Sequence, residues 1–215
     1  MPVVVLTLDQ RGSRRAADRV PDLLRRLADL PTVRAFARTA GDEVQGVLDS
    51  AEAVTRVLEL LLRDRGWHLG VGIGDVELPL PLDVRAGRGD AFLRARDAVV
   101  RAKSSPAHLR VAGPAAGPAA RRAEHLEAVL WLWAAVLARR SARGWEVADL
   151  VDAGLTYDEA AGRLGISPSA VSQRAQAAGL VEGARARRLV GDLVTDLLDG
   201  GAEGDPDVVA PGGRR

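Results

Sequence analysis

The hydrophobic pattern of the first half of the chain alternates between strand and helix periodicity. Residues 3–8 form an unbroken run of β-branched and aliphatic side chains, which is typical of a central strand buried on both faces. Residues 15–30 then place valine and leucine at helical spacing, and Pro31 ends that helix. Residues 33–39 and 44–49 flank a short turn, which indicates a β-hairpin.

This alternation continues to residue 113. Two more amphipathic helices and two more strands are predicted at 51–66, 67–80, 87–103 and 108–113. The first of these strands carries glycine at every second position on one side, which predicts that a helix or another backbone lies very close to Gly70, Gly72 and Gly74. The order β-α-β-β-α-β followed by α-β predicts an α+β fold, in which residues 2–113 form a ferredoxin-like sheet with one extra unit.

The second half of the chain carries only helical signals. Glycine and proline in 113–118 indicate a linker, and 119–140 predict a long connecting helix. The apolar stripe of that helix requires a large partner, either the next domain or a second copy of the chain. The tail, 200–215, is rich in Gly and Pro and acidic in its middle, so we predict that it is disordered.

Residues 144–198 predict an all-α domain of the winged-helix-like or simple helix-turn-helix type. Thr156 and Glu159 have the spacing of a capping box, and Gly165 marks a turn. A second helix begins at Ser167, with Pro168 in its first position. The small apolar residues that two closely crossing helices need are present at Ala160, Leu164, Ile166, Val171 and Ala175.

In a helix-turn-helix the second helix enters the major groove by its N-terminal end. The residues that we expect to contact DNA are Ser167, Ser169, Ser172, Gln173, Arg174 and Gln176. Glutamine can pair with adenine, and serine can contact base edges or phosphate. Nearby cations that could hold the DNA backbone are Arg185, Arg187 and Arg188. The groove face lacks acids and large apolar anchors, which favours DNA binding over the alternative of a helical hairpin for protein contact.

Composition limits the partners. Thirty basic against twenty-nine acidic residues give a net charge of +1, so no global field attracts nucleic acid or an anionic membrane, and any such binding depends on a local patch. The absence of cysteine excludes disulfides and thiolate metal sites. No segment approaches the length of a membrane span and the start lacks a signal-peptide pattern, so we predict a cytoplasmic protein without a membrane partner. A homodimer is expected, because one small module binds DNA weakly.

Acidic residues mark one end of the predicted sheet. Asp9 ends the first strand, and Asp42 lies at the hairpin tip beside it, with Glu43 next in sequence. Such oxygen ligands suit Mg²⁺ or Mn²⁺, whose coordination shells substrate phosphates often complete. The phosphate contacts would come from Arg11, Gly12, Ser13, Arg14 and Gly41. The alternative is that Asp9 caps the next turn and Asp42 forms an Asx-turn.

Three motifs in order, LTLDQRGSR, RTAGDEVQGVL and GVGIGDVE, resemble the palm domain of class III nucleotidyl cyclases and GGDEF diguanylate cyclases. With GDAFLRARDAVVRAK and the helix-turn-helix included, the chain is more similar to the SatD-like family of bacterial proteins. The palm resemblance implies that Asp9 and Asp42 are metal ligands, that Glu43 is a third ligand or a catalytic carboxylate, and that a nucleoside triphosphate binds.

The chain departs from both cyclase patterns. Ala40 replaces the first glycine of the diguanylate cyclase motif, and Leu93 and Asp97 occupy the positions of the asparagine and arginine that class III cyclases use. We therefore predict a DNA-binding transcriptional regulator whose palm-like domain senses a nucleotide or metal or mediates dimerisation. The alternative is a Mg²⁺- or Mn²⁺-dependent nucleotide-processing enzyme regulated by its C-terminal helices, and a third possibility is a scaffold that binds only protein.

Overall fold

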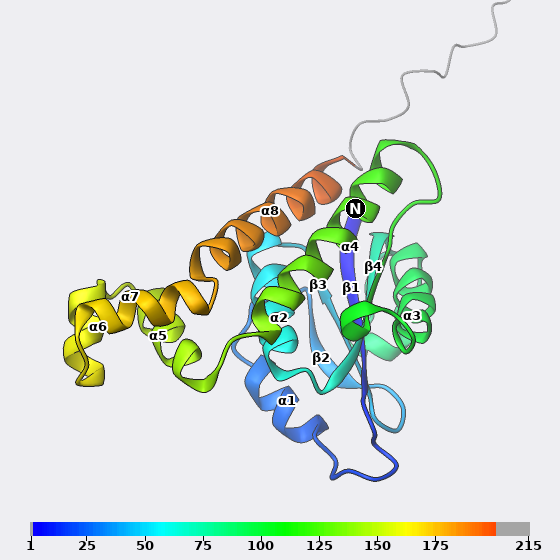
Figure 1. Cartoon of the computed structure of the whole chain (residues 1–215). Helices are drawn as coiled ribbons and strands as arrows, with labels where there is room; N and C mark the ends of the chain where they lie inside the picture. Colours follow the sequence, from blue (N-terminus) through cyan, green and yellow to red (C-terminus); the bar gives the residue numbers. More distant parts are fainter. Residues whose placement is uncertain (1, 201–215) are drawn as a thin grey trace, which may run out of the picture.

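A five-stranded sheet forms the centre of the fold, in the strand order β2-β3-β1-β4-β5 (Figure 1). The structure is a computed structural model and describes residues 2–200. The strands are β1 (Pro2–Gln10), β2 (Arg34–Arg38), β3 (Glu43–Leu48), β4 (Trp67–Asp75) and β5 (Leu109–Ala112). The helices are α1 (Val20–Leu27), α2 (Ala51–Asp64), α3 (Asp90–Ala102), α4 (Gly117–Ala138), α5 (Ala142–Asp152), α6 (Tyr157–Leu164), α7 (Pro168–Ala177) and α8 (Leu180–Asp199). The predicted mixed α and β architecture is confirmed.

Strand β1 is the middle strand, and both of its neighbours run antiparallel to it. Val5 lies opposite Val47 of β3 on one side and Gly72 of β4 on the other. Residues 3–8 are all buried, as an uninterrupted apolar run predicts. Strand β5 is parallel to β4, and α3 makes the crossover between them. Asp9 lies inside β1 rather than after it, because the pairing with β3 continues to Glu43.

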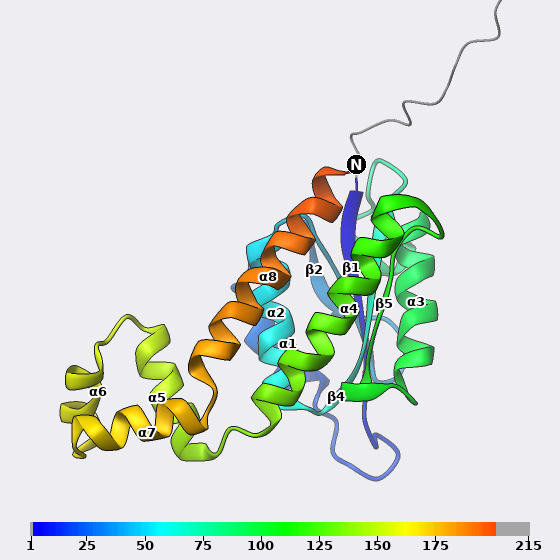
Figure 2. The ribbon, with the colours of Figure 1, turned by 45° about the horizontal axis from the view of Figure 1, so that its top comes forward.

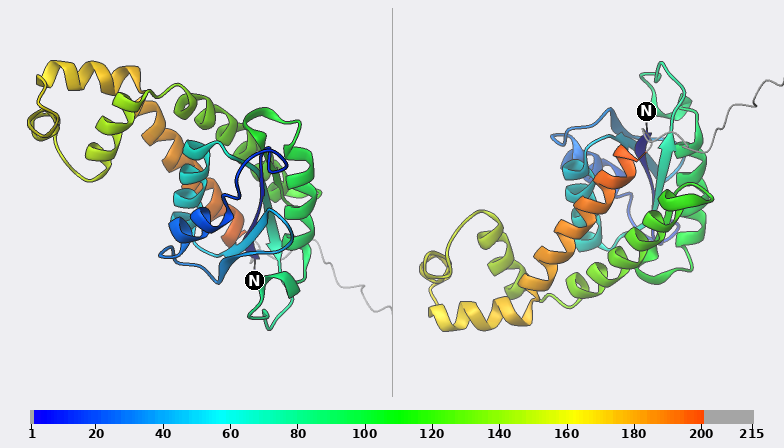
Figure 3. Two further views of the ribbon diagram at one scale, coloured as in Figure 1. Left: turned by 90° about the horizontal axis from the view of Figure 1, so that it is seen from below. Right: turned by 90° about the horizontal axis from the view of Figure 1, so that it is seen from above.

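Helices α1, α2, α4 and α8 cover one face of the sheet, and α3 covers the other (Figure 3). The larger core lies under the four helices and includes Val4, Leu6 and Leu8 of β1. The smaller core contains Val3 and Val5 and packs against α3. Consecutive side chains of a strand point to opposite faces, so the single run of β1 contributes to both cores.

Helix α3 lies against the glycines of β4, as their spacing predicted. A Cβ atom on Gly70 would lie 2.3 Å from the carbonyl oxygen of Ala95, and one on Gly72 would lie 2.2 Å from that of Ala91. Both distances are far below van der Waals contact. Only glycine therefore permits this approach of helix and strand.

Helices α5, α6 and α7 form a lobe that projects from the body of the molecule (Figures 1 and 2). Helix α4 leads from the body into this lobe, and α8 returns from it and packs along α4 and α2. The buried stripe of α4, Leu126, Leu130, Trp133 and Leu137, thus has its partner within the same chain. The range 144–198, predicted as one domain, is divided between the lobe and the body, because Val190, Val194 and Leu197 of α8 belong to the body's core.

Two further predictions from the sequence concern the C-terminal tail and membrane-spanning segments. The disordered tail predicted at 200–215 lies outside the described residues except for Gly200, which ends α8. Across residues 2–200, no helix combines the length and apolar character needed to cross a bilayer.

Candidate functional site

The lobe has a small core of its own. Val147 of α5, Ala160 and Ala161 of α6, and Val171 and Ala175 of α7 are all buried in it. Leu164 and Ile166 pack against this core. The predicted crossing of two short helices on small apolar residues is confirmed, with α5 as the third helix of the lobe.

Local hydrogen bonds define the ends of α6 and α7. The Thr156 hydroxyl accepts from the Glu159 backbone N–H at 3.3 Å, and a Glu159 carboxylate oxygen accepts from the Thr156 N–H at 2.8 Å, so the capping box is complete. Gly165 ends α6 in the left-handed conformation, with φ of 64°. The Ser167 hydroxyl accepts from the Ala170 N–H at 3.2 Å and caps α7. The turn between the two helices is therefore specified by short-range sequence.

One face of α7 points to solvent. Its exposed residues, Ser169, Ser172, Gln173 and Gln176, follow the i, i+3, i+4, i+7 spacing of a single helix face. Val171 and Ala175 occupy the opposite, buried face. The structure thus brings four of the six residues predicted to contact DNA onto one exposed surface, while Ser167 caps the helix beside them.

The remaining predicted cations are placed differently from one another. Arg174 is half-buried and pairs with Glu146 of α5 at 3.8 Å. Arg187 is the centre of an ion-pair network between body and lobe and is not directed at a groove beside α7. Arg185 and Arg188 are exposed on α8. Among the three arginines of α8 named from the sequence, Arg187 therefore has a structural role.

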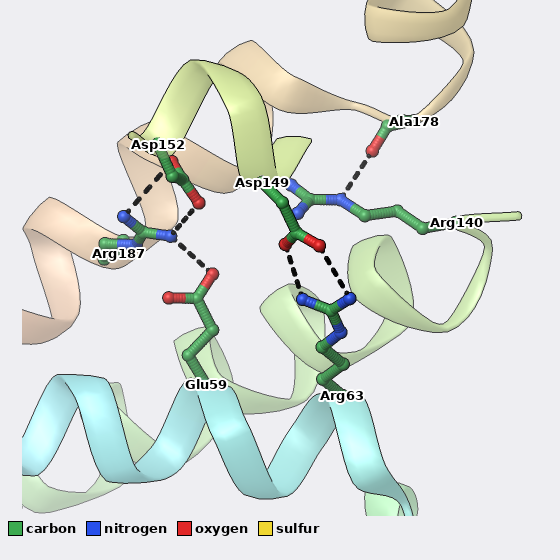
Figure 4. Close-up of polar contacts among 7 residues, drawn as sticks. All are labelled: Glu59, Arg63, Arg140, Asp149, Asp152, Ala178 and Arg187. Atoms are coloured by element: carbon green, nitrogen blue, oxygen red, sulfur yellow. Dashed lines mark hydrogen bonds and ion pairs between the residues drawn. The ribbon is translucent and has the colours of Figure 1, made fainter. Parts of the chain in front are cut away.

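This network joins α2, α5 and α8 (Figure 4). Arg187 Nη2 lies 2.5 Å from a Glu59 carboxylate oxygen and 2.9 Å from one of Asp152. Burial lowers the pKa of Arg187, but its hydrogen bonds to Glu59 and Asp152 outweigh burial, so the pKa is raised overall. One guanidinium thus links the body helix α2 to the lobe helix α5.

A second contact of the same kind lies beside it. Arg63 of α2 binds Asp149 of α5 through two nitrogen–oxygen contacts of 2.5 and 2.9 Å. The ring of Trp145 has Arg63 4.2 Å from its centroid and Arg140 4.6 Å from it. Arg140 also donates from Nε to the Ala178 carbonyl at 2.9 Å (Figure 4). We call these groups, Glu59, Arg63, Arg140, Trp145, Asp149, Asp152 and Arg187, the clamp.

The clamp was not evident from the sequence. Its members are separated by up to 128 positions, as between Glu59 and Arg187, and arginine and aspartate are frequent throughout the chain. The only signal was Trp145, which is the one aromatic residue of the short helix α5. Ion pairs between residues so far apart in the sequence depend on how the helices pack against one another.

Two of the three predicted metal ligands are cross-strand neighbours, and each of the two has a partner of its own. Asp9 and Glu43 lie opposite each other in the register of β1 and β3. The Asp9 carboxylate accepts from Lys103 Nζ at 3.2 Å, and Glu43 Oε1 accepts from the Thr39 hydroxyl at 2.6 Å. Within residues 2–200 no group of three or more His, Cys, Asp or Glu side chains is placed to hold a metal ion. Lys103 is thus the cationic partner of Asp9 in this structure.

Three of the five predicted phosphate residues meet, and the predicted metal ligand Asp42 joins them. Ser13, Arg14, Gly41 and Asp42 line a recess of about 360 Å³ between the loop after β1 and the hairpin tip. Its wall is held by Arg38, which pairs with Asp18 at 2.5 Å and donates to the Gly41 carbonyl at 2.7 Å. The hydrogen bond from Arg38 keeps the pKa of Asp18 below its ordinary value, and a bond from the Val20 N–H adds to this.

The other two predicted phosphate residues lie elsewhere in the loop. Gly12 turns the chain with φ of 68°. Arg11 extends away from the recess and donates from Nη1 to the Arg65 carbonyl at 2.9 Å. The buried Gln10 fixes the loop, because its side chain donates to the Ala17 carbonyl and accepts from the Arg19 N–H. The loop after β1 therefore contributes residues both to the recess at Asp42 and to the surface beside Arg65.

The helix that would carry the cyclase asparagine and arginine is α3. Leu93 is exposed on it, and Asp97 pairs with Arg101 at 2.7 Å. Arg94 is bound to the Ile73 carbonyl and to Asp90, each at 2.7 Å. Of these contacts, only the one with Ile73 joins α3 to the sheet, and Asp97 occupies the position where the cyclase pattern requires an arginine.

Two histidines meet at the end of the sheet where Asp9 lies. The rings of His68 and His108 are 5.1 Å apart, edge to face. Burial lowers the pKa of His68, and the negative charge of Asp9 partly opposes that shift. Burial and the positive charge of Arg11 lower the pKa of His108. Both rings are thus held in the neutral form more strongly than in water.

Comparison with known proteins gives no relative: the chain matches no protein-family model, no curated protein and no solved structure.

Proposed function

We propose that this chain is a DNA-binding transcriptional regulator of the SatD-like kind, with α5 to α7 as a helix-turn-helix domain and α7 as the helix that enters the major groove. The observation that carries the proposal is the exposed face of α7, where serine and glutamine side chains stand on one side of a firmly capped helix. Gln173 and Gln176 are suited to adenine, and the serines to phosphate or base edges.

The position of the lobe supports this role. It projects from the body, which places α7 away from the sheet (Figure 2). Its core is small, and its helix ends are defined by local capping, as in compact DNA-reading modules. The body then acts as the platform that positions the lobe through the clamp.

We further propose that the body is a palm-like, ferredoxin-like domain. The strand order β2-β3-β1-β4, with β5 added beside β4, supports this assignment, as do the antiparallel pairings of β1. Its part in regulation is to sense a small molecule or to pair two copies of the chain.

The charge of the lobe limits how strongly a single lobe binds DNA. Its acids outnumber its bases, but Asp149 and Asp152 are paired with arginines of the body. The exposed cations of α5, α6 and the first half of α8 are Arg143, Arg163, Arg185 and Arg188. Each phosphate contact contributes about −0.9 to the slope of log affinity against log salt, so one lobe yields a slope no steeper than about −4. A homodimer is required for tight binding.

The test begins with selection of sequences from a random duplex pool at about 50 mM salt, followed by anisotropy titration of the enriched duplex. Gln173→Ala/Gln176→Ala is expected to weaken binding roughly 5- to 150-fold per lost base contact and to relax the sequence preference. Glu124→Ala/His125→Ala, at exposed positions of α4, is the matched control and is expected to bind normally. A pool that enriches no sequence, together with no binding at low salt, would overturn the proposal.

The recess at Ser13, Arg14, Gly41 and Asp42 favours a second function, nucleotide binding with or without turnover. In this alternative a nucleotide phosphate meets Arg14, and Asp42 contributes to a Mg²⁺ or Mn²⁺ site together with phosphate oxygens. Isothermal titration of ATP and GTP with Mn²⁺ is expected to show binding that Asp42→Ala abolishes. Pyrophosphate release would establish an enzyme. Absence of metal-dependent binding to the wild type would eliminate this alternative.

A further inference from the structure

A second cavity, of about 340 Å³, lies at the opposite side of the loop after β1. Its walls come from the last turns of α2 and α4, the start of β4 and the loop that precedes β5. In Figure 2 this is the end of α4 that leads into the lobe. None of the residues that form the recess at Asp42 lines it, so the two spaces are separate.

The charged side chains of this cavity are cationic. Arg11 and Arg65 line it, and none of the described residues in its wall is acidic. The two arginines are fixed relative to each other, because Arg11 Nη1 donates to the Arg65 carbonyl at 2.9 Å. Their charges also contribute to the lowered pKa of His108, which lies in the same wall. The cavity therefore presents positive potential that an anion would neutralise.

The rest of the wall is apolar and aromatic. Leu61, Leu62 and Leu69 form one part, three alanines of α4 another, and the indoles of Trp67 and Trp131 complete it. The Trp131 Nε1–H is satisfied, because it donates to the Leu109 carbonyl at 2.9 Å. This composition, apolar walls with a few convergent polar groups, is typical of small-molecule sites.

Two polar atoms of the wall have no partner. Trp67 is only 2% exposed, and its Nε1–H is buried without a hydrogen bond. His108 Nδ1 is likewise buried and unpaired. Trp133 Nε1, which is outside this cavity, is buried and unpaired in the same way, so the cavity is identified by its charges and walls rather than by these atoms.

The backbone is strained at the same place. Within residues 2–200, the only non-glycine residues with positive φ are Arg65 at 59°, Ala107 at 53° and His108 at 53°. All three line this cavity. Such conformations are costly and persist where the surrounding structure imposes them, commonly at ligand sites.

We propose that this cavity binds a small organic monoanion, a carboxylate or sulfonate with an aromatic body. The ring lies among Trp67, Trp131 and the leucines, and the anionic group meets Arg11 and Arg65. An inorganic phosphate has the charge but not the apolar body, and a neutral aromatic has the body but not the charge, so neither satisfies the site.

The test uses the fluorescent aromatic sulfonate 8-anilinonaphthalene-1-sulfonate with the full chain. Saturable binding at one site is expected, with displacement by 2-naphthoate and not by 2-naphthamide or inorganic phosphate. Arg65→Gly removes the cation and suits the left-handed backbone at that position, so the fold is retained while affinity falls at least about tenfold. Ala135→Trp fills the cavity from α4 and abolishes binding.

The matched control is Ala128→Trp, at an exposed position of the same helix away from the cavity. It is expected to bind the dye as the wild type does. Dye binding that survives Ala135→Trp, or equal displacement by naphthamide and naphthoate, would overturn the proposal, as would the absence of saturable binding to the wild type. The assay contains no DNA, so its result is independent of the proposed function.

Discussion

Arg63 of α2 and Asp149 of α5 form a two-point ion pair between the body and the lobe, with nitrogen–oxygen distances of 2.5 and 2.9 Å (Figure 4). The hydrogen bond to Asp149 raises the pKa of Arg63, which burial alone would lower. Arg63 also lies over Trp145. This pair and the bridge made by Arg187 orient the lobe relative to the sheet.

Loss of this pair is expected to loosen the lobe more than it destabilises the chain. Arg63 and Asp149 side chains are 41% and 51% exposed, so Arg63→Gln costs only about 0.2–1 kcal/mol of the free energy of unfolding. Amide hydrogen exchange in α5 should nevertheless accelerate, because the lobe opens locally. Arg25→Gln, which removes an exposed pair within α1, is the control and should leave exchange in α5 unchanged.

The contact of α3 with β4 should not tolerate a side chain. Gly70→Ala and Gly72→Ala each place a Cβ within 2.4 Å of α3 backbone atoms. We expect each to lower the free energy of unfolding in urea by about 1–3 kcal/mol.

Gly162→Ala is the matched substitution for these two. Gly162 lies within α6, and a Cβ there would meet nothing within 4 Å. This change should raise stability by about 0.5–1 kcal/mol through helix propensity. A neutral outcome for Gly70→Ala would show that α3 can move away from the strand.

Like His108, His68 should lower the stability of the chain in mild acid. Burial depresses its native pKa below the ordinary 6.5, so the unfolded chain binds a proton at a higher pH than the native chain. The contribution of His68 to the free energy of unfolding is therefore fully present above about pH 6.5, and it is lost as the pH falls through the native pKa. Urea unfolding across this range measures the slope. His68→Asn should flatten it, and an unchanged slope would assign the effect to other groups.

The capping box should control the lobe. Thr156→Ala removes the hydroxyl that accepts from the Glu159 N–H, at a cost of about 1 kcal/mol. Exchange in α6 should accelerate, and DNA affinity should fall with it. Thr195→Ala on α8 deletes a hydroxyl that donates to the Gly191 carbonyl within the helix and should leave α6 unaffected.

Ligand binding in the cavity at Trp67 should affect the lobe through α4, because the last turn of α4 contributes to the wall of the cavity. If the proposed DNA binding holds, saturating 2-naphthoate should change the affinity for DNA about 5-fold or more, as in typical allosteric coupling. The Ala135→Trp variant should be insensitive to the ligand. Ligand binding without any change in DNA affinity would leave the cavity as a site that is uncoupled from the lobe.

Short-range patterns predicted many elements correctly. The run 3–8, the hairpin around Gly41, the glycines of β4 and the caps of α6 and α7 all appear as expected. Each depends on residues a few positions apart, whose conformational preferences do not require the rest of the chain. Placement of Ser13, Arg14 and Asp42 around one recess also followed from the strand order.

Most other longer-range relationships were not predictable. The pairing of Asp9 with Lys103, 94 positions away, was not predicted. Helix α8 was assigned to the helical domain and packs on the body. Arg11 was assigned to a phosphate and lies in a different cavity. Many arginines of this chain are equivalent partners for any carboxylate, so only their positions in space distinguish them.

The sequence by itself determined the periodicity of the strands and helices, the ends of the short helices and the glycine face on which α3 lies, because these follow from backbone preference and side-chain volume within a few residues. The tertiary structure alone decided which charges form the clamp, where the acids of the sheet end find partners, and that Arg65, Trp67 and His108 enclose a cavity. Those relationships depend on how distant helices pack across a common sheet, which no local pattern records.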